Sequence, residues 1–259
     1  MLCIYDDSFI DDYTQLTEKV HAYGANIFLQ IVAGGSQGRN NINSGKVIYG
    51  PSAHKNPITG IEAVEMTQED ICNLVEKFRD AAVRAKNSGF DGIQIHAAHG
   101  YLLSQFLNPF YNKREDEYGG DVDGRARILI DVYLSIREAV GDDFIIGMKI
   151  NCDDFEDEGL NFGESSWVCE RPAMMGLDFI EVSGANPSRV ISSPSEESYF
   201  KVFANVIAEN TQIPTILVGG NRSIEGMEEI LNNSSIEYFS LARPFIAEPC
   251  LLYTSDAAD

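Results

Sequence analysis

Six short apolar runs alternate with longer segments of helical spacing along this chain. Each run is rich in β-branched or aromatic residues and is flanked by Gly, Asn or Asp, as buried parallel strands are. The predicted strands cover residues 27–32, 92–95, 144–150, 179–182, 215–218 and 238–241. This order predicts a parallel sheet with right-handed crossovers, either an open doubly wound sheet or part of an eight-stranded barrel.

The segments between the strands carry apolar residues at every third or fourth position, which predicts helices. The helices predicted in this way cover residues 71–85, 128–139 and 223–231, and residues 7–23 are interpreted as a helix just before the first strand. The first strand–helix turn has no GxGxxG fingerprint, which disfavours the dinucleotide-binding doubly wound fold. The connection 34–66 is rich in Gly, Asn, Ser and Pro and follows the first strand, where α/β barrels carry functional loops.

Composition excludes several classes of protein. The 259 residues include 19 Lys and Arg against 40 Asp and Glu, a formal net charge of −21. We therefore expect no nucleic-acid or membrane partner, because both need positive patches. No stretch approaches the ~18 apolar residues of a membrane helix, so the cytoplasm is the expected location. The five cysteines are dispersed and form no CxxC, which disfavours a disulfide framework, a zinc site or an iron–sulfur cluster within this segment.

Two histidines and a tyrosine follow the second predicted strand. His96, His99 and Tyr101 would point into the mouth of a site at the carboxyl end of a barrel strand. Two imidazoles can donate to an oxygen that gains charge, and a phenol can deliver a proton. A structural histidine pair and a metal-binding pair are the alternatives. No third ligand at a convincing spacing supports a metal, and we predict none.

This stretch carries a resemblance to a known family. Residues 89–109, 112–120 and 124–127 closely resemble the NADH:flavin oxidoreductase / old yellow enzyme family, and further matches lie at 65–70, 217–222 and 240–244. The resemblance covers most of residues 7–249. It implies an FMN-containing (β/α)8 TIM barrel that takes hydride from NADH or NADPH. It also implies a small-molecule substrate with an activated C=C bond, such as an enone, enal or nitroalkene.

The resemblance also implies roles for individual residues. His96 and His99 would bind the carbonyl or nitro oxygen of the substrate, and Tyr101 would donate the proton to the α-carbon. The implied FMN-binding residues are Gln30 and Lys149 at the flavin ring, and Gly219, Gly220, Ala242 and Arg243 at the phosphate. A lysine at position 149 would be costly to bury without a partner. Asp153, Asp154 and the neighbouring acidic residues are interpreted as a solvated loop.

The family pattern is incomplete at both ends of this chain. Only about 26 residues precede the strand that holds Gln30, so we expect the first two βα units and the closing helix of the barrel to be missing. Residues 1–249 are interpreted as a partial FMN-binding barrel domain, and residues 250–259 as the translation of a sequencing adapter. Six strands of eight leave two open edges, so we expect this polypeptide to be inactive by itself.

Several functions stay open beside the ene-reductase. One is the barrel domain of a larger 2-enoate or 2,4-dienoyl-CoA reductase with an iron–sulfur segment downstream. From other classes come a barrel that binds a phosphorylated ligand without redox chemistry, and a metal hydrolase. A homo-oligomer is compatible with each of these functions.

Overall fold

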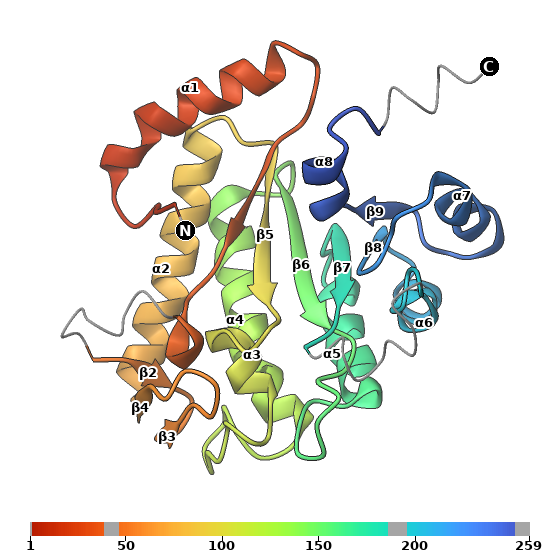
Figure 1. Ribbon diagram of the computed structural model, residues 1–259. Helices are drawn as coiled ribbons and strands as arrows, with labels where there is room; N and C mark the ends of the chain where they lie inside the picture. The colour runs from red at the N-terminus through yellow and green to blue at the C-terminus, as the bar shows by residue number, and fades with distance from the viewer. Residues whose placement is uncertain (1, 39–46, 186–195, 252–259) are drawn as a thin grey trace.

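The computed structural model describes residues 2–38, 47–185 and 196–251. Six parallel strands form one curved sheet, a half-barrel, in the order β1-β5-β6-β7-β8-β9 (Figure 1). The strands are β1 (Phe28–Ile31), β5 (Gly92–Ala97), β6 (Ile145–Asn151), β7 (Phe179–Ser183), β8 (Thr215–Val218) and β9 (Tyr238–Ser240). All six predicted strands are confirmed to within two residues at each end. The incomplete TIM barrel is the fold that we expected from the family resemblance.

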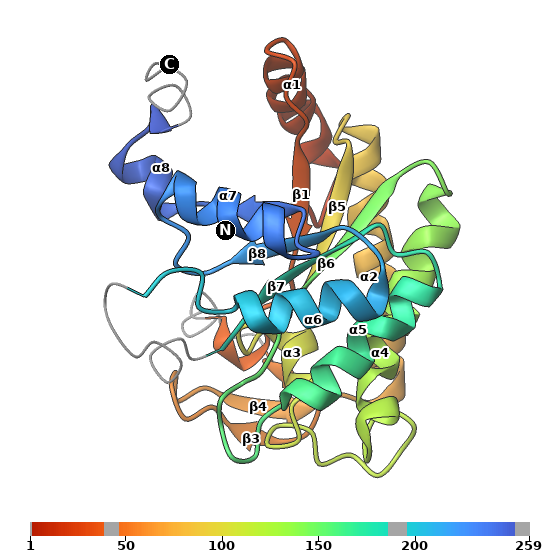
Figure 2. The same ribbon diagram turned by 90° about the vertical axis from the view of Figure 1, so that its right-hand side faces the viewer.

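Helices pack against the outer face of this sheet and around its ends (Figure 2). They are α1 (Ile10–His21), α2 (Gln68–Asn87), α3 (Leu102–Leu107), α4 (Val122–Val140), α5 (Phe162–Met174), α6 (Lys201–Thr211), α7 (Ile224–Asn233) and α8 (Arg243–Ala247). Two short 3₁₀ turns lie at Asp7–Phe9 and Gly35–Gln37. The four predicted helices are confirmed as α1, α2, α4 and α7.

Local capping explains where α2 begins and where α4 ends. The Thr67 hydroxyl accepts the backbone N–H of Asp70, and the Asp70 carboxylate accepts the backbone N–H of Thr67, which is a capping box at the start of α2. Helix α4 ends at Gly141, where φ is +78°, a conformation that glycine adopts without steric cost.

A small second sheet forms within the long connection after β1. It contains β2 (Tyr49–Gly50), β3 (His54–Lys55) and β4 (Glu62–Glu65) in the order β2-β4-β3. Sequence analysis identified this connection as a functional loop and missed the sheet. Strands of two to four residues are too short to show a period of alternation, so no sequence signal marked them.

The core lies between the half-barrel and the helices. Successive side chains of a strand point to opposite faces, so Ile93 and Ile95 of β5 lie on the helix side, whereas Gln94 and His96 lie on the other face. Both isoleucines are fully buried in the main apolar cluster. The same alternation places Ile146 and other apolar residues of β6 and β7 in the core. The inner face of the half-barrel therefore carries polar side chains such as Gln94 and His96, beside the edge-to-face rings of Phe28 and Phe179.

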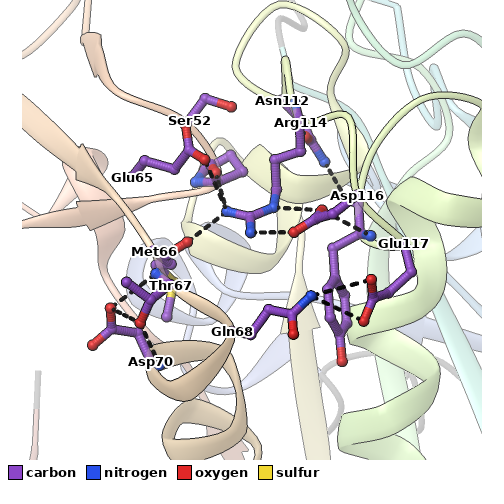
Figure 3. Close-up of polar contacts among 12 residues, drawn as sticks. Ser52, Glu65, Met66, Thr67, Gln68, Asp70, Asn112, Arg114, Asp116 and Glu117 are labelled. Carbon is purple, nitrogen blue, oxygen red and sulfur yellow. Dashed lines mark hydrogen bonds and ion pairs between the residues drawn. The ribbon is translucent and has the colours of Figure 1, made fainter.

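Arg114 joins the small sheet to the loop that connects α3 and α4 (Figure 3). Its guanidinium makes a two-pronged contact with Asp116, with N···O distances of 2.9 and 2.5 Å. Its Nη1 also donates to the backbone oxygens of Pro51 (2.8 Å) and Met66 (2.6 Å), which follow β2 and β4. The Arg114 side chain is only 4% exposed. One buried cation therefore ties two segments that are distant in sequence.

Replacing Arg114 by methionine should destabilise the protein strongly. The substitution leaves the Asp116 carboxylate and two carbonyl groups without their partner, and breaking one side of a buried ion pair costs about 3–5 kcal/mol. Urea unfolding followed by circular dichroism measures the change. Arg79→Met is the control, because within the described part of the chain Arg79 pairs with its exposed neighbour Asp80 alone, and this substitution should change stability by less than about 0.5 kcal/mol. Equal effects of the two substitutions would contradict the role of Arg114.

Candidate functional site

A row of four polar side chains crosses the inner face of the half-barrel. Gln30 of β1 donates from its amide to Gln94 of β5. Gln94 Nε2 donates to Glu181 Oε2 of β7 at 2.8 Å, and Lys149 Nζ of β6 lies 3.0 Å from Glu181 Oε1. Parallel pairing places Gln30 beside Gln94 and Lys149 beside Glu181. The two predicted flavin-ring residues, Gln30 and Lys149, are thus linked in one chain of contacts.

The row supplies the partner that a buried lysine needs. The side chain of Lys149 is 14% exposed and that of Glu181 is 7% exposed. At such depth an ammonium requires an opposite charge, and Glu181 provides it. Gln94 and Glu181 were not predicted from the sequence, although a polar residue within each apolar strand run was a usable signal. Gln30 is exposed on the edge strand, and its predicted contact with the flavin, like that of Lys149, stays a prediction.

His96, His99 and Tyr101 lie together at the carboxyl end of β5. The ring centroids of His96 and His99 are 5.2 Å apart, and those of His96 and Tyr101 are 5.0 Å apart, all in edge-to-face geometry. The backbone N–H of Ala98 donates to Nδ1 of His96 at 3.2 Å. This bond makes Nδ1 an acceptor and places the ring proton on Nε2. His96 can therefore donate a hydrogen bond from Nε2.

His99 is held from two neighbouring strands. Its Nε2 lies 2.7 Å from the hydroxyl oxygen of Ser183, the last residue of β7. Its backbone N–H donates to Oδ1 of Asn151, the last residue of β6, at 3.2 Å. The backbone of His99 has φ of +58°, in the left-handed region that few residues other than glycine adopt. These contacts therefore stabilise an uncommon backbone conformation at His99, the residue that is predicted to bind the substrate.

Burial keeps both imidazoles neutral. Desolvation lowers the pKa of His96 to about 3, and the nearby charges of His99 and Lys149 lower it in the same direction. Desolvation and the charge of Lys149 lower the pKa of His99 to about 4, against an opposing effect of Glu181. At neutral pH both rings are uncharged hydrogen-bonding groups.

The predicted phosphate residues line one cavity. A space of about 640 Å³ lies at the carboxyl ends of β7, β8 and β9, and Gly219, Gly220, Ala242 and Arg243 all line it. Gly219 and Gly220 have φ of +106° and +77°. A Cβ atom at either position would come within 2.7 Å of the ring of Tyr199. Glycine is therefore required here by the backbone and by the packed ring, whatever the cavity holds.

The lining of this cavity fits the phosphate end of FMN. Two positively charged residues, Arg222 and Arg243, belong to its lining, and the glycine turn brings backbone close to the space. Barrels commonly bind phosphate at the loops after their last two strands, which here are β8 and β9.

A second cavity, of about 820 Å³, meets the first at His99 and Ala185. Phe110, Tyr111 and Asp154 contribute to its lining. His99 is the member of the histidine pair that borders both spaces. His96, Tyr101, Gln30 and Lys149 line neither of them. A ligand that bridges the two cavities would pass His99.

Asp154 corrects an expectation from the sequence. The interpretation of this acidic segment as solvated is wrong for Asp154, which is 4% exposed. Its carboxylate accepts hydrogen bonds from Asn108 Nδ2 (2.7 Å), Asn151 Nδ2 (2.8 Å) and the backbone N–H of Leu160 (2.9 Å). A run of acidic residues carries no signal that separates one buried member from exposed neighbours, so the sequence could not show this.

In residues 2–38, 47–185 and 196–251, no three His, Cys, Asp or Glu side chains are grouped so that they could hold a metal ion. Over the same ranges, no helix has the length and hydropathy needed to cross a bilayer. The predicted adapter-derived tail falls mainly on residues 252–259, outside the described part of the chain.

The neutral imidazoles can be tested by titration. The NMR signals of the His96 and His99 rings should stay unchanged between pH 8 and pH 5. Because their folded pKa values lie below the ordinary 6.5, the unfolded chain takes up these protons first. The stability from keeping them neutral is complete above pH 6.5 and is lost as pH falls toward 4 and 3. A ring that titrates near pH 6.5 in the folded protein would contradict this prediction.

Comparisons with known proteins identify the family of this chain. The family model for the NADH:flavin oxidoreductase / NADH oxidase family matches residues 1–257. An NADH oxidase of Thermoanaerobacter brockii is 34% identical over 248 residues, which are 94% of this chain and 38% of that protein. An NADPH dehydrogenase of Bacillus licheniformis is 35% identical over 254 residues, which are 96% of this chain and 71% of that protein.

A solved structure supports the fold. The old yellow enzyme homologue from Zymomonas mobilis superposes with a TM-score of 0.84 at 24% identity, over 98% of this chain and 73% of that one. The cofactors expected from the resemblance, FMN with NADH or NADPH, are those of the matched family. The half-barrel, the matched family model and the curated relatives lead to one conclusion: this chain belongs to the NADH:flavin oxidoreductase / NADH oxidase family.

Proposed function

We propose that this chain provides the active site of an FMN-dependent ene-reductase, which uses NADH or NADPH to reduce the activated C=C bond of α,β-unsaturated carbonyl or nitro compounds. The reaction adds one hydride and one proton across the double bond. Bound FMN would supply the hydride chemistry, with Gly219, Gly220 and Arg243 holding its phosphate. Gln30 and Lys149 would face its ring from the inner face of the half-barrel.

The observation that carries the proposal is the pair of neutral imidazoles beside a phenol. A neutral imidazole carries one ring N–H, and it can donate a hydrogen bond from this group to a carbonyl or nitro oxygen. Such donors stabilise the negative charge that develops on this oxygen as hydride reaches the β-carbon. Tyr101, whose ring lies 5.0 Å from that of His96, would deliver the proton to the α-carbon and regain one from water.

One observation favours a larger protein as the setting. The chain spans 38% of the Thermoanaerobacter NADH oxidase that it matches. The barrel domain of a 2-enoate or 2,4-dienoyl-CoA reductase with further segments is therefore the second candidate. In this candidate the barrel would catalyse the same type of reaction, and the polypeptide would contain further segments outside the barrel. A purified full-length gene product that contains iron–sulfur clusters would favour this second candidate.

The first prediction of the proposal is a flavin cycle in the full-length gene product. The protein should be yellow, with about one FMN per chain. Under anaerobic conditions NADH or NADPH should bleach the flavin band, and cyclohexenone should restore it. A flavin that only oxygen reoxidises would point to a different electron acceptor. A colourless protein would remove FMN from the proposal and favour a non-redox phosphate-ligand barrel.

The second prediction identifies the proton donor. Tyr101→Phe should slow reoxidation by cyclohexenone by about 100-fold or more, because general acid catalysis contributes about 10²–10⁴-fold. Its rate of reduction by NADPH should change little, since that step delivers no proton to a substrate carbon. Stopped-flow absorbance of the flavin measures both rates.

Tyr111→Phe is the matched comparison for this experiment, because Tyr111 is the tyrosine that lines the second cavity beside His99. A large loss with Tyr111→Phe and none with Tyr101→Phe would assign the proton donor to Tyr111 instead.

A further inference from the structure

We propose that Asp154 is a positioning residue for His99, which it reaches through the side-chain amide of Asn151. The proposal deepens the proposed function and rests on it for the role of His99 toward substrate. The contacts themselves are independent of that role. They run from a buried carboxylate to an amide and from the amide to the backbone of the histidine.

The carboxylate of Asp154 is surrounded by donors. Oδ1 accepts from Asn151 Nδ2 at 2.8 Å. Oδ2 accepts from Asn108 Nδ2 at 2.7 Å and from the backbone N–H of Leu160 at 2.9 Å. All three partners present N–H groups, and only a carboxylate accepts on both oxygens. The residue at position 154 is therefore chemically specified by its neighbours.

Backbone groups fix the orientation of both amides. The Asn108 oxygen accepts the backbone N–H of Phe110 at 2.7 Å, so the NH₂ group of Asn108 must face Asp154. The Asn151 oxygen accepts the backbone N–H of His99 at 3.2 Å, so the NH₂ group of Asn151 must also face Asp154. A backbone N–H can only donate, so reversing either amide would place two donors against each other. The acceptor at Asp154 therefore decides that the oxygen of Asn151, and not its NH₂ group, faces the backbone N–H of His99.

The receiving end of this chain is the uncommon backbone of His99. Its φ of +58° is followed by φ of +72° at Gly100. Conformations of this kind persist where surrounding contacts hold them. Ser183 holds the ring of His99, whereas the Asn151 amide holds its backbone. Loss of the backbone contact would let the turn relax and move the ring away from the space between the two cavities.

An amide in place of Asp154 would reverse the arrangement of hydrogen-bond donors and acceptors between position 154 and Asn151. With its oxygen toward Asn108 and Leu160, the new amide would present its NH₂ group to the NH₂ group of Asn151. Asn151 relieves that clash only by turning over, and its own NH₂ group then faces the N–H of His99. The substitution Asp154→Asn should therefore break the contact with His99 without changing the size of the side chain.

The exchange of the two residues should repair the break. In the double variant Asn151→Asp/Asp154→Asn, the carboxylate at position 151 accepts from His99 on one oxygen and from the new amide on the other. The amide at position 154 still accepts from Asn108 and Leu160 through its oxygen. The pair again contains one carboxylate and one amide, and every donor has an acceptor.

The test uses two measurements on the full-length protein. In the protein labelled with ¹⁵N-histidine, the backbone amide signal of His99 is identified by its loss in His99→Asn. We expect Asp154→Asn to shift this signal and to speed its exchange with solvent at least tenfold, and the double variant to restore both. In the FMN-loaded protein, Asp154→Asn should slow reoxidation by cyclohexenone about tenfold or more, because small displacements of catalytic groups cost factors of 10–100. Reoxidation by oxygen should change less than twofold.

Asp153→Asn is the matched control. Asp153 lies in the same loop and accepts the backbone N–H groups of Phe155 and Phe162 through its carboxylate. The same substitution there removes an acceptor without touching the chain to His99. It should leave the His99 signal and the cyclohexenone rate unchanged.

Two outcomes would overturn the proposal: an unchanged His99 signal in Asp154→Asn, or a double variant that does not restore the signal. Should Asp154→Asn fail to fold, the double variant alone decides, because it must fold and show the native His99 signal. A wild-type protein that does not reduce cyclohexenone would contradict the proposed function. The His99 signal would still test the positioning role.

Discussion

Side chains of a strand alternate between two faces, and in this half-barrel the alternation separates the core from the chemistry. One face packs isoleucine, valine and methionine against the helices. The other carries Gln30, Gln94, Lys149 and Glu181 in contact with one another. Charged groups on that face are far from bulk solvent, so each needs a partner on a neighbouring strand. The ion pair of Lys149 and Glu181 allows a cation to sit beside the histidine pair, where it lowers the pKa of both rings.

The candidate site forms at the carboxyl ends of these strands. His99, Asn151 and Ser183 end or follow three consecutive strands, and parallel pairing brings their ends to one edge of the sheet. The histidine is thereby held by its backbone and by its ring from two directions. The buried Arg114 has a separate role, because its hydrogen bonds hold the small sheet against the loop that follows α3.

The sequence was most informative where a pattern repeats. Strands and helices follow from periodicity and caps, and motif resemblance located His96, His99 and Tyr101, which the structure brings together. It was least informative where a contact joins distant segments. The partner of Lys149 could not be identified until the register placed Glu181 beside it. Nothing in the acidic run 153–158 distinguished the buried Asp154, because its burial depends on Asn108 and Asn151 from other elements.

The left-handed backbone at His99 limits the amino acids that can occupy this position. Among residues other than glycine, the left-handed region is most accessible to Asn, Asp and His, and it is strained for β-branched side chains. The proposed role adds a second requirement, a neutral donor, which removes aspartate. Histidine and asparagine are then the two side chains that satisfy both the backbone and the chemistry. Asparagine is therefore the replacement of His99 that keeps both the left-handed backbone and a neutral donor.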